Sequence, residues 1–184
     1  IALLIIGTLL QNASLDSASP KERRTAIEQQ GVPGNAAAVP AFAAALKKEP
    51  QSEIRAEMLV ALVRIHDRSV LPVIAEMLKS DLDKDVRLQA VDAFVRYYIP
   101  ADETGPIRTV FNRIKGAFAE PDRPTISEEV RVDAEATQAL ANTMQKDFND
   151  DVRIAAVRAL GSLKAREDRK STRLNSSHVA LSRM

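Results

Sequence analysis

Residues 71–93 read LPVIAEMLKSDLDKDVRLQAVDA and repeat in outline residues 39–61, VPAFAAALKKEPQSEIRAEMLVA, which lie 32 residues earlier. Each segment opens with an apolar residue and a proline, then reaches Leu-Lys, and later an apolar residue followed by arginine. A fixed period of this length is typical of stacked repeats, in which each unit packs on its neighbours. The recurrence therefore predicts an architecture, although it does not identify what that architecture binds.

The second half of each segment predicts an amphipathic helix. Its apolar residues recur at offsets that lie on one face of an α-helix, and a third copy follows Asp151. The positions two and five residues after the first apolar residue of each face are apolar as well, which predicts a wide buried sector. The three faces are Ile54, Met58, Ala61, Leu62 and Ile65, then Val86, Ala90, Ala93, Phe94 and Tyr97, then Val152, Ala156, Ala159, Leu160 and Leu163, flanked by Ala56, Leu59, Leu88, Val91, Ile154 and Val157.

A shorter first helix precedes each of these second helices. The first helices at Val39–Leu46 and Leu71–Leu78 carry proline in the first turn, where the missing N–H costs nothing. A related first helix is predicted at Asp133–Lys146. Asp85 and Asp151 stand directly before two second helices, and we expect their carboxylates to accept hydrogen bonds from free backbone N–H groups there.

These features resemble a known family. The opening Asp-Val-Arg at residues 85–87 and 151–153, with Ala-x-x-Ala-Leu-Gly at Ala156–Gly161, is similar to HEAT repeats, in the short variant also found in phycobilisome-lyase-like proteins. The resemblance covers roughly Ser19–Ala165. It implies an all-α fold, an α-solenoid of antiparallel helix pairs with about four units, one of them irregular, that serves as a binding scaffold.

Two regions depart from the pattern. Ser19–Gly31 is polar and suits a leading second helix that caps the array. Val86 and Val152 are 66 residues apart, about two periods, which predicts one further unit between them with its first helix at Gly105–Phe118. The rest of Tyr98–Val132 shows no recognisable second helix, and both a functional insertion and a degenerate repeat remain open interpretations.

The N-terminal residues predict export. Ile1–Leu10 is apolar but too short for a membrane-spanning helix of roughly 20 residues, and small polar residues follow it. This order resembles the apolar region of a secretory signal peptide. We expect residues 1–18 to form a signal peptide or anchor, with cleavage after Ala13 or Ala18, and a periplasmic or secreted bacterial protein. The alternative is a buried N-terminal helix.

The C-terminal residues break the repeat pattern. The stretch Asp168–His178 resembles translated sequencing-adapter DNA, and it is polar and rich in serine and arginine. We therefore predict a non-native or disordered tail at residues 167–184, which leaves residues 19–166 as the repeat domain. The alternative is a basic tail that contacts anions.

Composition disfavours several classes of function. The chain has 26 Lys and Arg against 25 Asp and Glu, so it lacks the basic excess typical of nucleic-acid binding. It has no cysteine and two histidines, which argues against a thiolate metal site. His66 fits a helix end better than a catalytic base, and the acidic clusters lack the spacing of a calcium loop. We predict no enzymatic activity, cofactor or metal.

Removing the apolar positions from the second helices leaves a candidate partner-binding stripe. In a HEAT-like stack these residues would line the concave side, and the alternative is a merely solvated face. By contrast, Arg55, Arg87 and Arg153 are predicted to pair with acidic residues of neighbouring units and to hold the stack together. The stripe consists of Glu57, Val60, Arg64, Gln89, Asp92, Arg96 and Arg158.

The sequence thus favours a non-enzymatic protein–protein interaction scaffold that is exported, with unknown protein partners. The alternative function is a repeat module of a larger enzyme or lyase-like protein whose catalytic part lies elsewhere. A nucleic-acid partner is disfavoured because acidic Glu57 and Asp92 alternate with Arg64 and Arg96 along the stripe. Membrane contact is expected through the N-terminal segment alone.

Export can be tested directly. Residues 1–19, placed behind Met and a short basic segment and fused to a periplasmic reporter, should carry the reporter across the inner membrane. Reporter activity after cell fractionation is the measurement, and a fusion lacking residues 1–10 is the control. A reporter that stays in the cytosol with both fusions would contradict the prediction.

Overall fold

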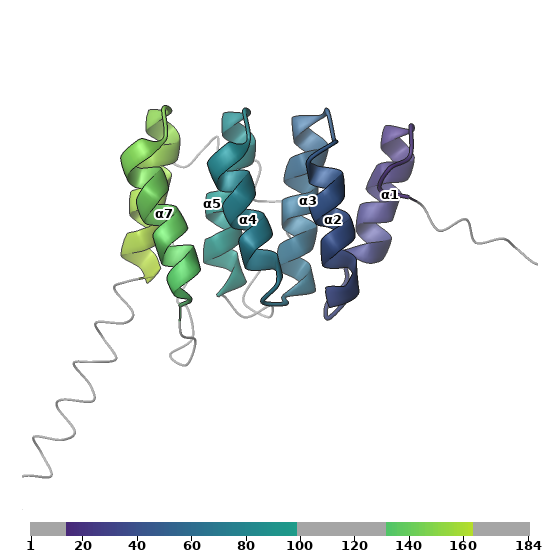
Figure 1. The fold of residues 1–184 in the computed structure, drawn as a ribbon, viewed down its shortest axis with the longest axis horizontal. Helices are drawn as coiled ribbons and strands as arrows, with labels where there is room; N and C mark the ends of the chain where they lie inside the picture. The colour runs from purple at the N-terminus through teal and green to yellow at the C-terminus, as the bar shows by residue number, and fades with distance from the viewer. Residues whose placement is uncertain (1–13, 99–131, 164–184) are drawn as a thin grey trace, which may run out of the picture.

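The computed structural model describes residues 14–98 and 132–163, which form a row of helices standing side by side (Figure 1). Within these ranges there is no strand, and no helix is both long and apolar enough to cross a membrane. The elements in chain order are α1 (Pro20–Gln30), the short 3-10 helix η1 (Ala36–Ala38), α2 (Val39–Leu46), α3 (Ser52–Ile65), α4 (Val70–Ser80), α5 (Lys84–Tyr97), α7 (Ala134–Lys146) and a helix over residues 150–163.

The helices form two layers. The first helices α2, α4 and α7 stand in the foreground of Figure 1, with α3 and α5 behind them. Each first helix packs on its own second helix, as α2 does on α3 and α4 on α5, and the second helices α1, α3 and α5 also pack on one another in turn. This arrangement confirms the predicted α-solenoid of helix pairs.

The predicted register of the second helices is confirmed. In α3 the face from Ile54 to Ile65 is at most 1% exposed, and the corresponding face of α5 is fully buried from Val86 to Phe94. The flanking apolar positions differ in exposure between units. They are buried in α3, whereas Ile154 and Val157 of the last helix are 45% and 50% exposed. The prediction that these two residues are buried is therefore wrong.

Local capping chemistry also differs from the prediction in one respect. The N-cap of α5 is Asp83, whose carboxylate accepts hydrogen bonds from the N–H groups of Asp85 and Val86. Asn149 does the same for the helix over residues 150–163, in which Asp151 is the second residue and is exposed. The cap therefore lies two residues earlier than expected, because the side chain must stand outside the helix to reach its first free N–H groups.

The helix predicted within Ser19–Gly31 is present as α1 (Pro20–Gln30). Helix α1 buries Ala26 and Ile27 and packs on α3. It ends at Gly31, where a Cβ atom would stand 2.5 Å from the Cβ of Ala61. Only glycine allows α1 to approach α3 this closely, so this residue helps to fix the first contact between second helices.

The α7 unit packs directly on the α4–α5 unit. Helix α7 contacts α4, and Arg87 of α5 bonds Asp147, which follows α7. In the stack these two units are therefore neighbours. The further unit predicted between them in the sequence, with its first helix at Gly105–Phe118, lies outside the described residues.

Two substitutions in α5 test the register. Ala90 is fully buried, so Ala90→Asp places an unpaired carboxylate in the core and should lower the free energy of unfolding by roughly 3 kcal/mol or more. Arg96 forms only an i,i+4 pair with Asp92, and Arg96→Ala should cost about 0.5 kcal/mol. Urea denaturation measures both values, and equal losses would contradict the register.

Candidate interaction surface

A series of buried ion pairs joins each second helix to the turn of the following unit. In every case the arginine Nε and Nη2 atoms reach the two oxygens of one carboxylate, at distances between 2.6 and 3.1 Å. Such a bidentate geometry is stronger and more directional than a single hydrogen bond. We call this series the arginine ladder; its pairs are Arg23–Glu49, Arg55–Asp81 and Arg87–Asp147.

Each ladder arginine also holds its own turn. The Nη1 atom of Arg87 donates to the carbonyl oxygens of Asp81 and Leu82, at 2.8 and 3.2 Å. Asp81 in turn accepts from the N–H of Asp83 at 2.9 Å while it binds Arg55. The hydrogen bond with Asp81 raises the pKa of Arg55. Because these partners compensate the buried charges, the ladder sets the position of each turn and the spacing between units.

The ladder confirms the predicted role of Arg55 and Arg87, but Arg153 behaves differently. Its Nη1 atom donates to the carbonyl of Asp147 in its own turn, as the other arginines do. Its Nη2 atom pairs with Asp150, the exposed first residue of its own helix, instead of a carboxylate of another unit. Sequence reasoning missed Arg23, although it lies 32 residues before Arg55 in the same register.

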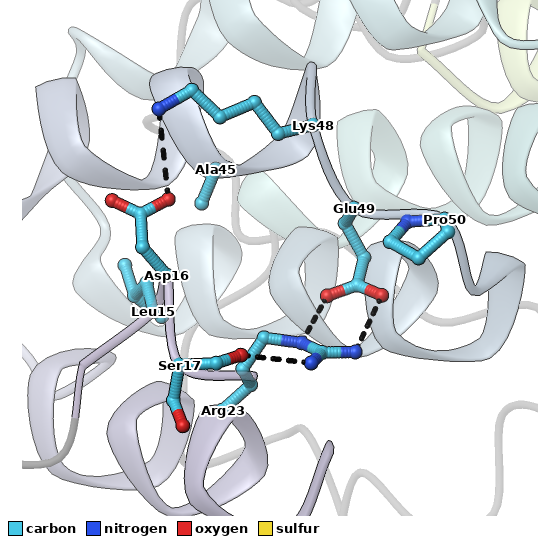
Figure 2. Close-up of a pocket in the computed structure, with 8 residues that line it drawn as sticks. All are labelled: Leu15, Asp16, Ser17, Arg23, Ala45, Lys48, Glu49 and Pro50. Atoms are coloured by element: carbon cyan, nitrogen blue, oxygen red, sulfur yellow. Dashed lines mark hydrogen bonds and ion pairs between the residues drawn. The ribbon is translucent and has the colours of Figure 1, made fainter. Parts of the chain in front are cut away.

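Figure 2 shows the first ladder pair at a surface hollow of about 400 Å³. Arg23 lies at its base, bonded to Glu49 and to the carbonyl oxygen of Ser17, and Asp16 faces Lys48 at 3.7 Å. The side chains of Arg23 and Glu49 are 10% and 1% exposed and bind each other. The ion pair at this hollow therefore joins α1 to the next unit, and the charges of Arg23 and Glu49 neutralise each other.

On α3, the stripe residues Glu57, Val60 and Arg64 are all partly exposed. Glu57 pairs with Arg24 of α1 at 3.1 Å, with both side chains more than 40% exposed. The Nε atom of Arg64 is buried and has no hydrogen-bond partner in the described part of the chain. This portion of the stripe is therefore partly accessible, although the Nε atom of Arg64 itself is covered.

On α5, the stripe is narrower than predicted. Gln89 is only 2% exposed, so its assignment to an exposed stripe is wrong. Asp92 and Arg96 pair with each other at 2.6 Å and are partly exposed. Helices α3 and α5 are in contact, so the charged residues of α5 lie on the helix next to the one that carries those of α3. Arg158 is exposed on the helix over residues 150–163. Whether the stripe lines a concave side stays a prediction.

Two large apolar side chains in the inter-helix turns escaped the sequence analysis. Leu82 is 91% exposed and Phe148 is 77% exposed. Both stand five residues before a second-helix arginine, a shared spacing that could have identified them. The ring of Phe148 lies 4.2 Å from the guanidinium carbon of Arg87 and so adds a cation–π contact to the ladder.

Polar contacts also join the end of α5 to the start of α7. The Tyr98 hydroxyl donates to the Asp133 carboxylate and accepts from the Asp133 N–H, and Arg68 pairs with the same carboxylate. Burial raises the pKa of Tyr98, so its phenol stays protonated and able to donate near neutral pH. His66 ends α3 in a left-handed conformation and stacks on Tyr97, which confirms its expected place at a helix end. No group of side chains in the described ranges could hold a metal ion.

Residues 8–94 match the family model of HEAT repeats. Together with the stacked helix pairs, this match fits a HEAT-repeat protein, and HEAT repeats are generally protein-interaction modules. The matched range includes α1 to α4 and most of α5, and it begins inside the segment predicted to be a leader. The comparison with curated proteins returned no match.

The arginine ladder yields a stability prediction. Arg87→Ala leaves the buried Asp147 carboxylate without its cation and should lower the free energy of unfolding by about 3–5 kcal/mol. Asp147→Asn should act in the same direction, and the double variant should cost less than the two single losses combined. Chemical denaturation of all three variants measures this coupling.

Arg153→Ala provides the matched control. Because its partner Asp150 is largely exposed, this variant should cost no more than about 1 kcal/mol. Equal losses at positions 87 and 153, or additive losses at 87 and 147, would contradict the structural role assigned to the ladder.

Proposed function

We propose that the chain is a non-enzymatic scaffold that binds a protein partner through the stripe on α3 and α5. The observation that carries this proposal is the pairing of rigid support with an accessible surface of mixed charge. The ladder fixes the turn before α5 against α3, while Glu57, Val60 and Arg64 of α3 stay partly exposed. A preorganised surface loses little conformational entropy on binding.

The charges of this surface favour a mixed-charge protein segment. Glu57 and Asp92 alternate with Arg64 and Arg96 on neighbouring helices. A polyanion would be repelled by the carboxylates, since nucleic-acid affinity depends on unopposed Lys and Arg at the phosphates. A polypeptide with both signs of charge and free backbone carbonyls matches the surface better, and such charge complementarity supports partner choice.

We further propose that the scaffold is exported and that its leader ends at Ala13. Leu15 is only 6% exposed, so it forms part of the folded core. Arg23 donates to the carbonyl oxygens of Ser17 and Ala18, at 2.9 and 3.1 Å. Cleavage after Ala18 would remove these contacts, whereas cleavage after Ala13 would keep them. The N-terminal residue of the exported reporter, read by mass spectrometry, distinguishes the two sites.

The stripe can be tested by comparing partner recovery between variants. The pair Arg64→Ala and Arg96→Ala should reduce recovery of the specific partner at least tenfold, about 1.4 kcal/mol of binding free energy. The matched control is Lys47→Ala with Lys79→Ala, two exposed residues of the first-helix layer, which should leave recovery unchanged. Quantitative mass spectrometry of cross-linked complexes from the source cells is the measurement.

Thermal denaturation must first show that both double variants remain folded. Equal recovery by the stripe variant and the control would contradict the proposed surface. Retention of the wild-type chain on a DNA column at low salt, lost in the stripe variant, would instead favour nucleic acid.

A further inference from the structure

We propose that the chain forms a two-fold dimer through the edge of the stack at which each first helix turns into its second helix. We call this edge the turn edge. Its apolar tips are Pro50, Leu82 and Phe148, which occupy the same position in successive units, five residues before the arginine that follows the first buried residue of the second helix. The occupant is a second copy of this chain, so the inference goes beyond the partner proposed for the stripe.

The tips of the turn edge are apolar and face solvent. Leu82 is 91% exposed and Phe148 is 77% exposed, and Pro50 is exposed as well. By contrast, the turn between α3 and α4, which lies at the opposite end of its helices, consists of the polar residues 66–69. The two most exposed large apolar side chains of the described residues therefore lie on the same edge, and such patches are typical of contact surfaces.

Arg87 holds both large tips in place. Its Nη1 atom donates to the carbonyl oxygen of Leu82 at 3.2 Å, and its guanidinium carbon lies 4.2 Å from the centre of the Phe148 ring. Lys84 pairs with Asp151 at 3.8 Å, which joins the starts of the same two second helices. Because these contacts fix the two turns before any association, burial of the tips costs little conformational entropy.

Exposed charges flank the tips in two rows of opposite sign. On the side of the first helices, Lys79 lies in the last turn of α4 and Lys146 ends α7. On the side of the second helices, Asp85 and Asp151 are the second residues of their helices, and Lys84 among them is paired with Asp151. Helix dipoles favour this order, because cations stabilise the C-terminus of a helix and anions its N-terminus. Each antiparallel pair therefore presents a basic and an acidic side at its turn.

A polarised edge of this kind is complementary to itself in one orientation. A two-fold axis that runs along the row of helices places the basic side of each copy against the acidic side of the other. Lys79 then faces Asp85 of the second copy, and Leu82 faces its own counterpart. Within residues 14–98 and 132–163, neither Lys79 nor Asp85 has an ion-pair partner, so both charges are available for this contact.

Other orientations and occupants are less favourable. A two-fold axis across the row would place lysines against lysines, which like-charge repulsion disfavours. A membrane of anionic lipid or a nucleic acid would meet the acidic row as well as the basic one. Charge complementarity thus favours a second copy in a single orientation. Because the contact is confined to turns and helix ends, we expect a dissociation constant on the order of 10–100 µM.

Sedimentation equilibrium of the chain at concentrations from about 1 µM to about 1 mM tests the dimer. We expect reversible dimerisation that Leu82→Glu weakens about tenfold, because two carboxylates then meet at the axis. The Leu82 side chain is almost fully exposed, so this variant keeps the fold. The matched control is Ile154→Glu, which changes an exposed apolar residue outside the turn edge and should leave the dimer intact.

A charge exchange tests the orientation. Lys79→Glu and Asp85→Lys should each weaken the dimer about tenfold, because two-fold symmetry repeats each contact and reversal replaces attraction by repulsion. Both changes in one chain should restore dimerisation, since opposite charges then meet again in exchanged positions. Thermal denaturation checks that every variant is folded.

Four results would overturn the proposal. They are a chain that stays monomeric over this range, a dimer that tolerates Leu82→Glu, a charge exchange that does not restore association, and a dimer lost in Ile154→Glu. Binding of a monomeric chain to phosphatidylglycerol vesicles, lost in Leu82→Glu, would identify a membrane as the occupant instead. The stripe variant, Arg64→Ala with Arg96→Ala, should dimerise like the wild-type chain, so failure of one surface is distinguishable from failure of the other.

Discussion

The arginine ladder is the interaction on which the rest of this structure depends. Arg87 is 1% exposed, and a buried guanidinium is tolerated only when hydrogen bonds and an opposite charge replace its water. Its donors reach two carbonyls of one turn and a carboxylate of the next turn. The requirement to satisfy one buried group thus fixes the conformation of a turn and the position of a neighbouring unit at the same time.

This constraint acts in space and does not depend on distance along the chain. Arg55 and Asp81 are separated by 26 residues, whereas Arg87 and Asp147 are separated by 60, and yet the two pairs have nearly the same geometry. Tyr98 and Asp133, which are 35 residues apart in the chain, are likewise within hydrogen-bonding distance. The ladder can therefore keep its register across a long intervening segment.

The sequence predicted what depends on local periodicity. The buried face of α3, the limits of α2 and the place of His66 at a helix end follow from residues that are close together in the chain, and all three were predicted correctly. The pairing of Arg55 with an acidic turn was also predicted. The direct contact between the α5 and α7 units was not, because a count of periods measures chain length and cannot show which units meet.

Errors at the candidate surface have a similar physical origin. A helical pattern separates polar from apolar residues, but Gln89 is polar and buried, while Ile154 and Val157 are apolar and exposed. Exposure at these positions depends on whether a neighbouring unit covers that side of the helix. Sequence periodicity therefore identifies the side of a repeat that is suited to contact, and only the arrangement of units shows whether that contact is already made.

The arrangement of contacts also divides the second helices by role. Helix α3 packs on the first helices α2 and α4 and on the second helices α1 and α5. The sector that remains carries Val60 and Arg64, which have no place in the ladder. Substitution there leaves the pairs that hold the stack intact, so this sector can vary while the architecture stays fixed. The separation of ladder and stripe on one helix thus lets a rigid repeat array tolerate change in one sector.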